Sequence, residues 1–241
     1  MCENDGDRLG IARVPLIVGG RLSSVGERLG VGWMTYNPVQ MLIYHRYALH
    51  EAEGVIRSFE AVFPEAHRYV DVGCGSGAYA AEAVRRGHPT VGLERSWAGR
   101  LMARRQGVRC ESFDLRRYVP VEQAGSFDLA YCFEVAEHLP PALGDSLVDA
   151  ICGLAPKVVF SAAPPGQGGV GHINEQPAEY WHARFSSKGF HHDASASAAM
   201  RESFQQNGIW APWLKSNTAV YVSSSRGETS HDLSPEGSAD H

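Results

Sequence analysis

Short apolar runs alternate with helical stretches through the middle of the chain. From Arg68 onward, runs rich in β-branched and aromatic residues are separated by segments whose apolar residues recur at helical spacing. The expected strands are Tyr69–Val72, Thr90–Glu94, Val108–Glu111, Phe127–Phe133 and Lys157–Ala162. The expected intervening helices are Ala78–Arg86, Trp97–Gln106 and Pro141–Leu154. This alternation predicts an α/β fold, in which helices cover both faces of a mostly parallel sheet.

The flanking segments follow other patterns. Residues 1–36 are glycine-rich without a clean period, and Asn37-Pro38 then opens a helix that we expect over Val39–Phe63. After the alternating region we expect helices at Pro177–Lys188 and Ala194–Gln206, and strands at Phe190–Asp193 and Thr218–Ser223. The polar composition after that predicts disorder. The chain therefore divides into an arm with its helix (1–64), a main domain (65–224) and a disordered tail (225–241).

Composition and charge narrow the class of protein. The 241 residues, 44% of them hydrophobic, suffice for one domain with additions, and a net charge of −5 disfavours a nucleic-acid or anionic-membrane partner. Neither a signal peptide nor an apolar run long enough to span a membrane is present, which favours a cytoplasmic location. The cysteines are scattered and odd in number, which predicts neither a disulfide framework nor a zinc knuckle: Cys2, Cys74, Cys110, Cys132 and Cys152.

A glycine-rich turn follows the first expected strand. The sequence VDVGCGSG, residues 70–77, ends that strand and opens a helix, so its glycines allow a close approach of the backbone to a ligand. This signal alone is weak, because Gly73, Gly75 and Ala78 would also satisfy a dinucleotide pattern. Asp71 favours S-adenosylmethionine (SAM), since a carboxylate there attracts the ammonium of a methionine moiety and repels a pyrophosphate.

Two further acids follow the next strands. Glu94 ends the second strand, where a carboxylate accepts hydrogen bonds from ribose hydroxyls in either kind of nucleotide cofactor. Asp114 comes just after the third strand, where it could accept a hydrogen bond from an adenine amino group or simply cap the turn that begins at Leu115. Together these acids predict a bound nucleoside.

The four motifs together resemble those of class I SAM-dependent methyltransferases. They are D-x-G-C-G-x-G, the two acids and FDLAYCFEVAEHLP at residues 127–140, and the resemblance extends from about Arg68 to Phe160. It implies a Rossmann-like methyltransferase fold with a seven-stranded sheet, an N-terminal helical lid and methyl transfer to a small-molecule acceptor. It also implies cofactor contacts from Asp71, Gly73, Cys74, Gly75, Gly77, Glu94, Asp114, Leu115, Phe133 and Glu134.

A second group of polar residues falls at the carboxyl ends of the fourth and fifth strands. Glu134, Glu137 and His138 follow the fourth strand, and His172 follows the fifth. Such carboxylates and imidazoles could bind Mg²⁺, Mn²⁺ or Fe²⁺ and leave positions open for substrate oxygens. The E-x-x-E-H element resembles that of ubiquinone-biosynthesis O-methyltransferases and small-RNA 3′-terminal 2′-O-methyltransferases, which implies metal-ligand roles for these four residues.

A metal-free alternative stays open at this point. In it His138 acts as a base or orienting group, with His172 as a second catalytic candidate, or the element has only structural roles. A hydroxyl acceptor needs a base or a metal because its pKa lies far above 7, whereas an amine needs only its neutral lone pair. The aromatic residues Tyr180, Trp181 and Phe185 fall on one expected helix, where they would wall an acceptor pocket or, more commonly, form core.

The leading hypothesis is therefore SAM-dependent O-methylation of a small hydroxylated metabolite, with or without a divalent ion. The alternatives are a metal-independent N-methyltransferase and an RNA 2′-O-methyltransferase. An NAD-linked oxidoreductase and a SAM-fold protein without activity are more distant ones. The acceptor, the pathway and the oligomeric state are not encoded in any recognisable motif.

Overall fold

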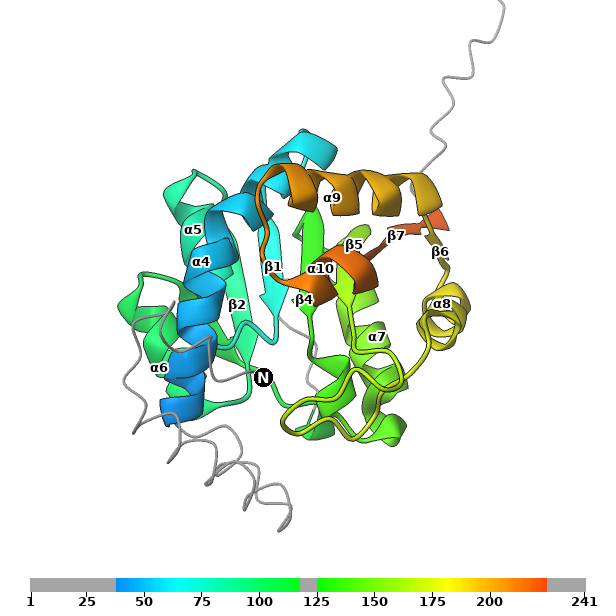
Figure 1. Ribbon diagram of the computed structural model, residues 1–241, viewed down its shortest axis with the longest axis horizontal. Coiled ribbons are helices and arrows are strands. Elements are labelled where there is room, and N and C mark those ends of the chain that lie inside the picture. The colour runs from blue at the N-terminus through cyan, green and yellow to red at the C-terminus, as the bar shows by residue number, and fades with distance from the viewer. Residues whose placement is uncertain (1–37, 118–124, 225–241) are drawn as a thin grey trace, which may run out of the picture.

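A seven-stranded sheet forms the centre of the computed structural model, which describes residues 38–117 and 125–224 (Figure 1). The strand order is β3-β2-β1-β4-β5-β7-β6. The strands are β1 Tyr69–Val72, β2 Thr90–Glu94, β3 Arg109–Ser112, β4 Leu129–Phe133, β5 Lys157–Ser161, β6 Phe190–His192 and β7 Ala219–Ser223. The helices are α4 Pro38–Val62, α5 Ala78–Arg85, α6 Trp97–Arg105, α7 Gly144–Cys152, α8 Ala178–Ser187, α9 Ala194–Gln206 and α10 Pro212–Asn217.

The sheet is mostly parallel, as the sequence predicts. Strands β1 to β5 pair in parallel with their neighbours, and only β7 runs antiparallel, against both β5 and β6. The carboxyl ends of β1, β2, β4 and β5 therefore meet at one edge of the sheet. Ligands of open α/β sheets bind at this edge, next to the point where the chain reverses its direction of winding between β1 and β4.

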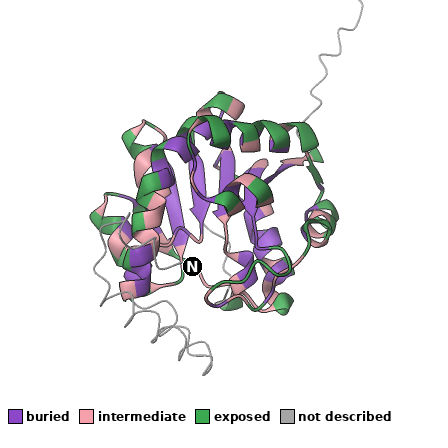
Figure 2. Ribbon diagram, in the orientation of Figure 1, coloured by how far each residue is buried: buried purple, intermediate pink, exposed green. Residues whose placement is uncertain are grey.

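Two apolar cores lie on opposite faces of the sheet. On one face, residues of α4, α9 and α10 pack against Tyr69, Tyr131 and Val159, and α9 and α10 lie in front of the sheet in Figure 1. On the other face, α7 and α8 contribute to a core around Phe160. The central strands β1, β2, β4 and β5 are buried almost throughout, whereas the helices are exposed on their outer sides (Figure 2). Burial on both faces explains why the strands read as continuous apolar runs.

Helix α4 contacts the main domain at several points. The Glu51 carboxylate, only 4% exposed, accepts hydrogen bonds from the backbone N–H groups of Trp210 and Ala211 at 2.9 to 3.2 Å. Nearer the start of the helix, His45 Nδ1 lies 2.9 Å from the Ser76 hydroxyl in the glycine turn. The described part of the expected lid helix is thus attached to the loop before α10 and to the glycine turn.

Two elements differ from the expectation. The single helix expected at Pro141–Leu154 is a 3₁₀ turn, Pro141–Leu143, with Pro140 at its N-cap, followed by α7. Helix α10 was not expected, since six residues carry no clear period. Trp181 and Phe185 form core, the more common of their two expected roles, because they are 3% and 0% exposed and pack on Phe160.

The expected arm (1–36) and tail (225–241) lie outside the described residues. Among the described helices, none is both long and apolar enough to cross a membrane.

Candidate active site

The glycine turn between β1 and α5 has left-handed backbone at three positions. Gly73, Gly75 and Gly77 have φ values of 77°, 54° and 78°. A Cβ at Gly73 would overlap Val135, and one at Gly77 would overlap Ala103, so these two glycines allow close packing. A Cβ at Gly75 would have no atom within 4 Å. Gly75 therefore faces the space that a ligand would enter.

Glu94, at the end of β2, lies beside this turn. Its carboxylate accepts hydrogen bonds from the backbone N–H groups of Gly75, at 2.8 Å, and Ser96. Burial raises the pKa of Glu94 above its ordinary value, although these hydrogen bonds oppose the shift. Each oxygen keeps a second lone pair, so the residue can still accept hydroxyl groups of a ribose.

Asp71 lies on β1, directly below the turn. It is 3% exposed, and its Oδ2 has no hydrogen-bond partner in the described part of the chain. Burial raises its pKa well above the ordinary value. The Tyr131 hydroxyl opposes this shift only in part. A buried carboxylate oxygen without a partner is costly, so this atom fits a protein that receives a cationic group, such as the ammonium of SAM.

The remaining expected cofactor residues have visible structural contacts. Asp114 Oδ1 accepts the Arg116 N–H at 3.1 Å and so caps the 3₁₀ turn Leu115–Arg117, which is the capping role considered above. Phe133 packs among aromatic rings of the α4/α9 face, including Phe59 and Phe204. The Cys74 thiol lies 3.7 Å from the Cys110 thiol. Their contact with SAM stays a prediction.

Glu134 has a strained backbone at the end of β4. Among the described non-glycine residues it alone has a positive φ, 52°. Its Oε2 accepts a hydrogen bond from Gln167 Nε2 at 2.9 Å, while Oε1 is buried without a partner in the described residues. Gln167 in turn accepts from Asn217 Nδ2, at the end of α10, at 2.8 Å.

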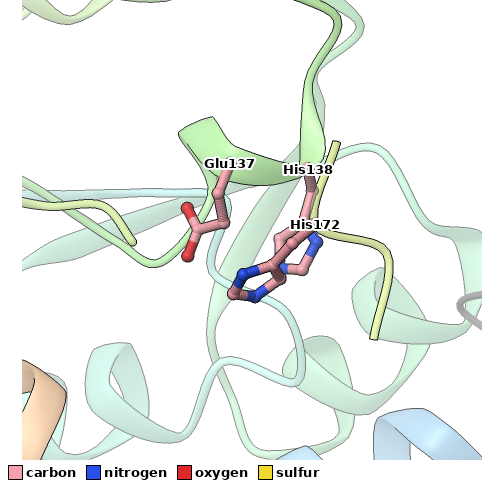
Figure 3. Close-up of side chains that lie close together, drawn as sticks. All are labelled: Glu137, His138 and His172. Atoms are coloured by element: carbon pink, nitrogen blue, oxygen red, sulfur yellow. The ribbon is translucent and has the colours of Figure 1, made fainter. Parts of the chain in front are cut away.

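Three of the four expected metal ligands lie together. Glu137 and His138 come from the 3₁₀ turn Ala136–His138 after β4, and His172 comes from the loop after β5 (Figure 3). One ligand atom from each lies within 4.8 Å of the others, and the two imidazole rings meet edge to face at 4.9 Å. Glu134 lies outside this three-residue group: its Oε2 accepts from Gln167, and its Oε1 has no partner in the described residues. Its role as a metal ligand stays a prediction.

Backbone hydrogen bonds join the two loops that carry this group. The Glu137 carbonyl accepts the N–H groups of Ile173 and Asn174 at 2.9 and 3.0 Å. His138 Nδ1 lies 3.1 Å from the Gly171 carbonyl, and His172 Nδ1 lies 2.9 Å from Glu175 Oε1. Both rings therefore carry their proton on Nδ1, which leaves Nε2 as the lone-pair nitrogen. Burial lowers the pKa of His138 to about 4, so its imidazole is neutral at pH 7.

In the part of the chain that the structure describes, the Glu137 carboxylate is buried without hydrogen bonds that would offset its loss of hydration. It is fully buried, and neither carboxylate oxygen has a hydrogen-bond partner among the described residues. Burial and the neighbouring Glu134 carboxylate raise the pKa of Glu137 well above its ordinary value. A cation between Glu137 and the two histidines would compensate it.

Sequence reasoning missed Gln167 and Glu175. Gln167 has no signal beyond its place among glycines. The spacing of three residues between His172 and Glu175 was the available clue for Glu175, because an acid in that position can reach the histidine ring.

The comparison with known families agrees with this geometry. The model of a family described as a methyltransferase domain matches residues 44–212, most of the chain. The chain belongs to this family. It is a SAM-dependent methyltransferase of class I, which confirms the resemblance of the sequence motifs.

Individual relatives share only part of the methyltransferase. Ubiquinone biosynthesis O-methyltransferases of Acinetobacter baumannii and Alkalilimnicola ehrlichii are 37% and 35% identical over 82 and 81 residues, 30% and 32% of this chain. The matches span about a third (33%) of the length of these relatives.

Solved structures share the fold at low identity. A SAM-bound amino pentose methyltransferase from Micromonospora echinaspora has a TM-score of 0.57 at 20% identity, covering 77% of this chain and 96% of its own. A sugar N-methyltransferase from Streptoalloteichus has a TM-score of 0.55 at 19% identity, covering 72% and 86%. These likenesses confirm the Rossmann-like methyltransferase fold.

Proposed function

We propose that this methyltransferase transfers the methyl group of SAM to an oxygen of a small hydroxylated acceptor, at a divalent ion held by Glu137, His138 and His172. The observation that carries the proposal is the buried, unpartnered Glu137 carboxylate beside two histidines. Removing two charged oxygens from water without a partner costs several kcal/mol, about 3 or more. A bound cation offsets that cost.

The donor set fits a borderline metal better than Mg²⁺. Two imidazoles and one carboxylate form the ligand set of non-haem Fe²⁺ sites, and the carboxylate also suits Mn²⁺, whereas Mg²⁺ prefers oxygen ligands throughout. When bound, the ion lowers the pKa of a coordinated hydroxyl and orients it. Three protein ligands leave positions for acceptor oxygens, so vicinal diols and catechols are the acceptors that fit.

The cofactor end of the site supports the same chemistry. Asp71 would attract the ammonium of SAM, Glu94 would accept the ribose hydroxyls, and Gly75 leaves space for the ligand. Because the sulfonium is already an activated donor, the remaining task is to align an acceptor lone pair with it and to remove a proton. The carboxyl edge of β1 and β4 brings the two halves of the site together.

The partial relatives favour oxygen as the acceptor atom. Those matched at 37% and 35% identity are O-methyltransferases by name. A neutral His138 with a pKa of about 4 is a weak base for an isolated hydroxyl, so a metal-free mechanism fits an amine better.

The test is methyl transfer to a panel of catechols, vicinal diols and primary amines, measured as S-adenosylhomocysteine release. The purified protein is assayed after chelator treatment and again after Mn²⁺ is restored. We expect activity on a catechol or diol that is lost with chelator and regained with Mn²⁺. In the His138→Ala variant we expect SAM affinity within about twofold of wild type and turnover reduced at least tenfold. Chelator-insensitive transfer to an amine would contradict the proposal and favour the metal-free N-methyltransferase.

A further inference from the structure

We propose that Glu175 positions His172 for its part in the site, by fixing which ring nitrogen carries the proton and by holding the loop that presents the ring. The metal-binding consequence of this role rests on the proposed function. The positioning itself rests only on the contacts of residues 164–175.

One carboxylate organises this loop. Glu175 Oε1 accepts hydrogen bonds from His172 Nδ1 at 2.9 Å and from the Gly168 N–H at 2.7 Å, and Oε2 accepts the Gly166 N–H at 2.8 Å. Hydrogen bonds to a carboxylate are stronger than neutral ones, so three of them restrain both the glycine turn and the ring. Gly166 and Gly168 have φ values of 88° and 67°, which few residues other than glycine adopt.

The turn that Glu175 holds is shaped around the histidine. A Cβ at Gly169 would fall on the His172 ring, so the imidazole packs directly against the backbone there. With Nδ1 bonded to Glu175 and one ring side against Gly169, the His172 ring has little rotational freedom. Since Nδ1 bonds to Glu175, Nε2 is the His172 nitrogen left with a lone pair for the group with Glu137 and His138.

The same turn also reaches Glu134. Gln167 lies between the two glycines whose N–H groups Glu175 accepts, and it donates to Glu134 and accepts from Asn217. Loss of the Glu175 carboxylate would therefore release His172 and loosen the hold on Glu134 together. No other described carboxylate hydrogen-bonds to His172.

In this arrangement a carboxylate accepts a hydrogen bond from the ring nitrogen of a histidine that would bind the metal through its other nitrogen. The acceptor fixes the Nδ1–H tautomer and raises the basicity of Nε2, and losing such a partner typically reduces metal affinity about 10- to 100-fold. Glu175 touches neither the proposed ion nor the acceptor, so it is a positioning residue.

The experiment compares Glu175→Ala and Glu175→Gln with Glu179→Ala, an exposed acid one turn along on α8. The first measurement is long-range ¹H–¹⁵N NMR of the imidazoles in chelator-treated, full-length protein, with the His172 signals assigned by their loss in His172→Gln. The second is calorimetric titration of Mn²⁺ in the presence of SAM.

We expect His172 in wild type and Glu179→Ala to be the Nδ1–H tautomer. Glu175→Ala should shift it toward a mixture with Nε2–H and weaken Mn²⁺ binding about 10- to 100-fold, with SAM affinity unchanged. Glu175→Gln retains one acceptor oxygen, so its tautomer mixture and its Mn²⁺ affinity should lie between those of wild type and Glu175→Ala. An unchanged His172 tautomer in Glu175→Ala would overturn the proposal. If wild type bound no Mn²⁺, the proposed metal would fail, and the tautomer comparison would still decide the role of Glu175.

Discussion

At the scale of single residues, two buried acids with unpartnered oxygens lie in the two halves of the proposed site. Asp71 Oδ2 lies below the glycine turn, and both oxygens of Glu137 lie beside the two histidines. Native proteins pair almost all such atoms, so each of these positions is consistent with a cationic partner. In the proposed site, the methionine ammonium would pair with Asp71 and a divalent ion with Glu137.

Glu137→Gln tests the second position. Because burial raises the pKa of Glu137, the folded protein binds its proton more tightly than the unfolded chain does, so the carboxylate costs stability as pH rises above about 4.5. At pH 7.5 without metal, we expect the variant to melt at the wild-type temperature or above it. Excess Mn²⁺ should raise the wild-type melting temperature by mass action and leave the variant unchanged. The check is scanning calorimetry with chelator and with Mn²⁺. An equal Mn²⁺-induced rise in both proteins would place the ion elsewhere.

Residue types at strand ends are readable from sequence, whereas side-chain directions are not. The E-x-x-E-H element predicted Glu137 and His138, and the position after the fifth strand predicted His172. The backbone of Glu134 has a φ of 52°, and its carboxylate accepts a hydrogen bond from Gln167. No local sequence pattern encodes this contact, because the two residues are 33 positions apart. Glu175 was missed for another reason: two of its three partners are backbone N–H groups, to which residue types give no signal.

At the scale of elements, α4 and the loop before α10 form a unit across 159 residues of sequence. Glu51 accepts the two N–H groups at Trp210 and Ala211, and the Tyr47 ring stacks on Trp210 at 5.7 Å. Strands were predictable from apolar runs because both of their faces are buried. The short helix α10 was not, because its position depends on this distant carboxylate.

Glu51→Ala should destabilise the protein markedly. The change leaves two buried N–H groups without an acceptor, which costs about 3 kcal/mol of the free energy of unfolding. Glu53→Ala is the matched control, since Glu53 lies on the same helix and makes only an exposed pair with Arg57. Its effect should stay within about 0.5 kcal/mol. Urea denaturation measures both, and equal effects would contradict the role given to Glu51.

Two stacked histidines at the α8–β6–β7 edge are expected to make stability depend on pH. His182 stacks on His192 at 4.2 Å and lies 2.9 Å from the Tyr221 hydroxyl. Burial lowers the pKa of both histidines, and the charge of His182 lowers that of His192 further. The unfolded chain therefore takes up protons first, and stability falls as pH drops below about 6.5.

His192→Gln should reduce this acid sensitivity. It removes one titrating ring and the repulsion on the other, so the free energy of unfolding should fall less between pH 7.5 and 5.5 than in wild type. His191→Gln, at the exposed neighbouring position, should behave like wild type. Denaturant titrations at the two pH values check this, and an identical fall in all three proteins would show that the stacked pair does not contribute.

At the scale of the whole molecule, the sheet order places the glycine turn, Glu94 and the group of Glu137, His138 and His172 at one edge. The motifs predicted this fold and the family, because β–α alternation and strand-end acids are local features. The division at residues 64 and 224, the cytoplasmic location and the absence of a nucleic-acid partner stay predictions. Acceptor identity depends on the surface of the assembled site, so no single motif encodes it.

The most direct test is calorimetric titration of SAM into wild type, Gly75→Arg and Gly87→Arg. Both glycines have positive φ, 54° and 93°, and open space where a side chain would begin, so the two variants share the same backbone cost. Only Gly75 faces the proposed cofactor. We expect wild type and Gly87→Arg to bind one SAM with equal, micromolar affinity and Gly75→Arg to bind none. Absence of SAM binding to wild type, or unchanged affinity in Gly75→Arg, would contradict the account.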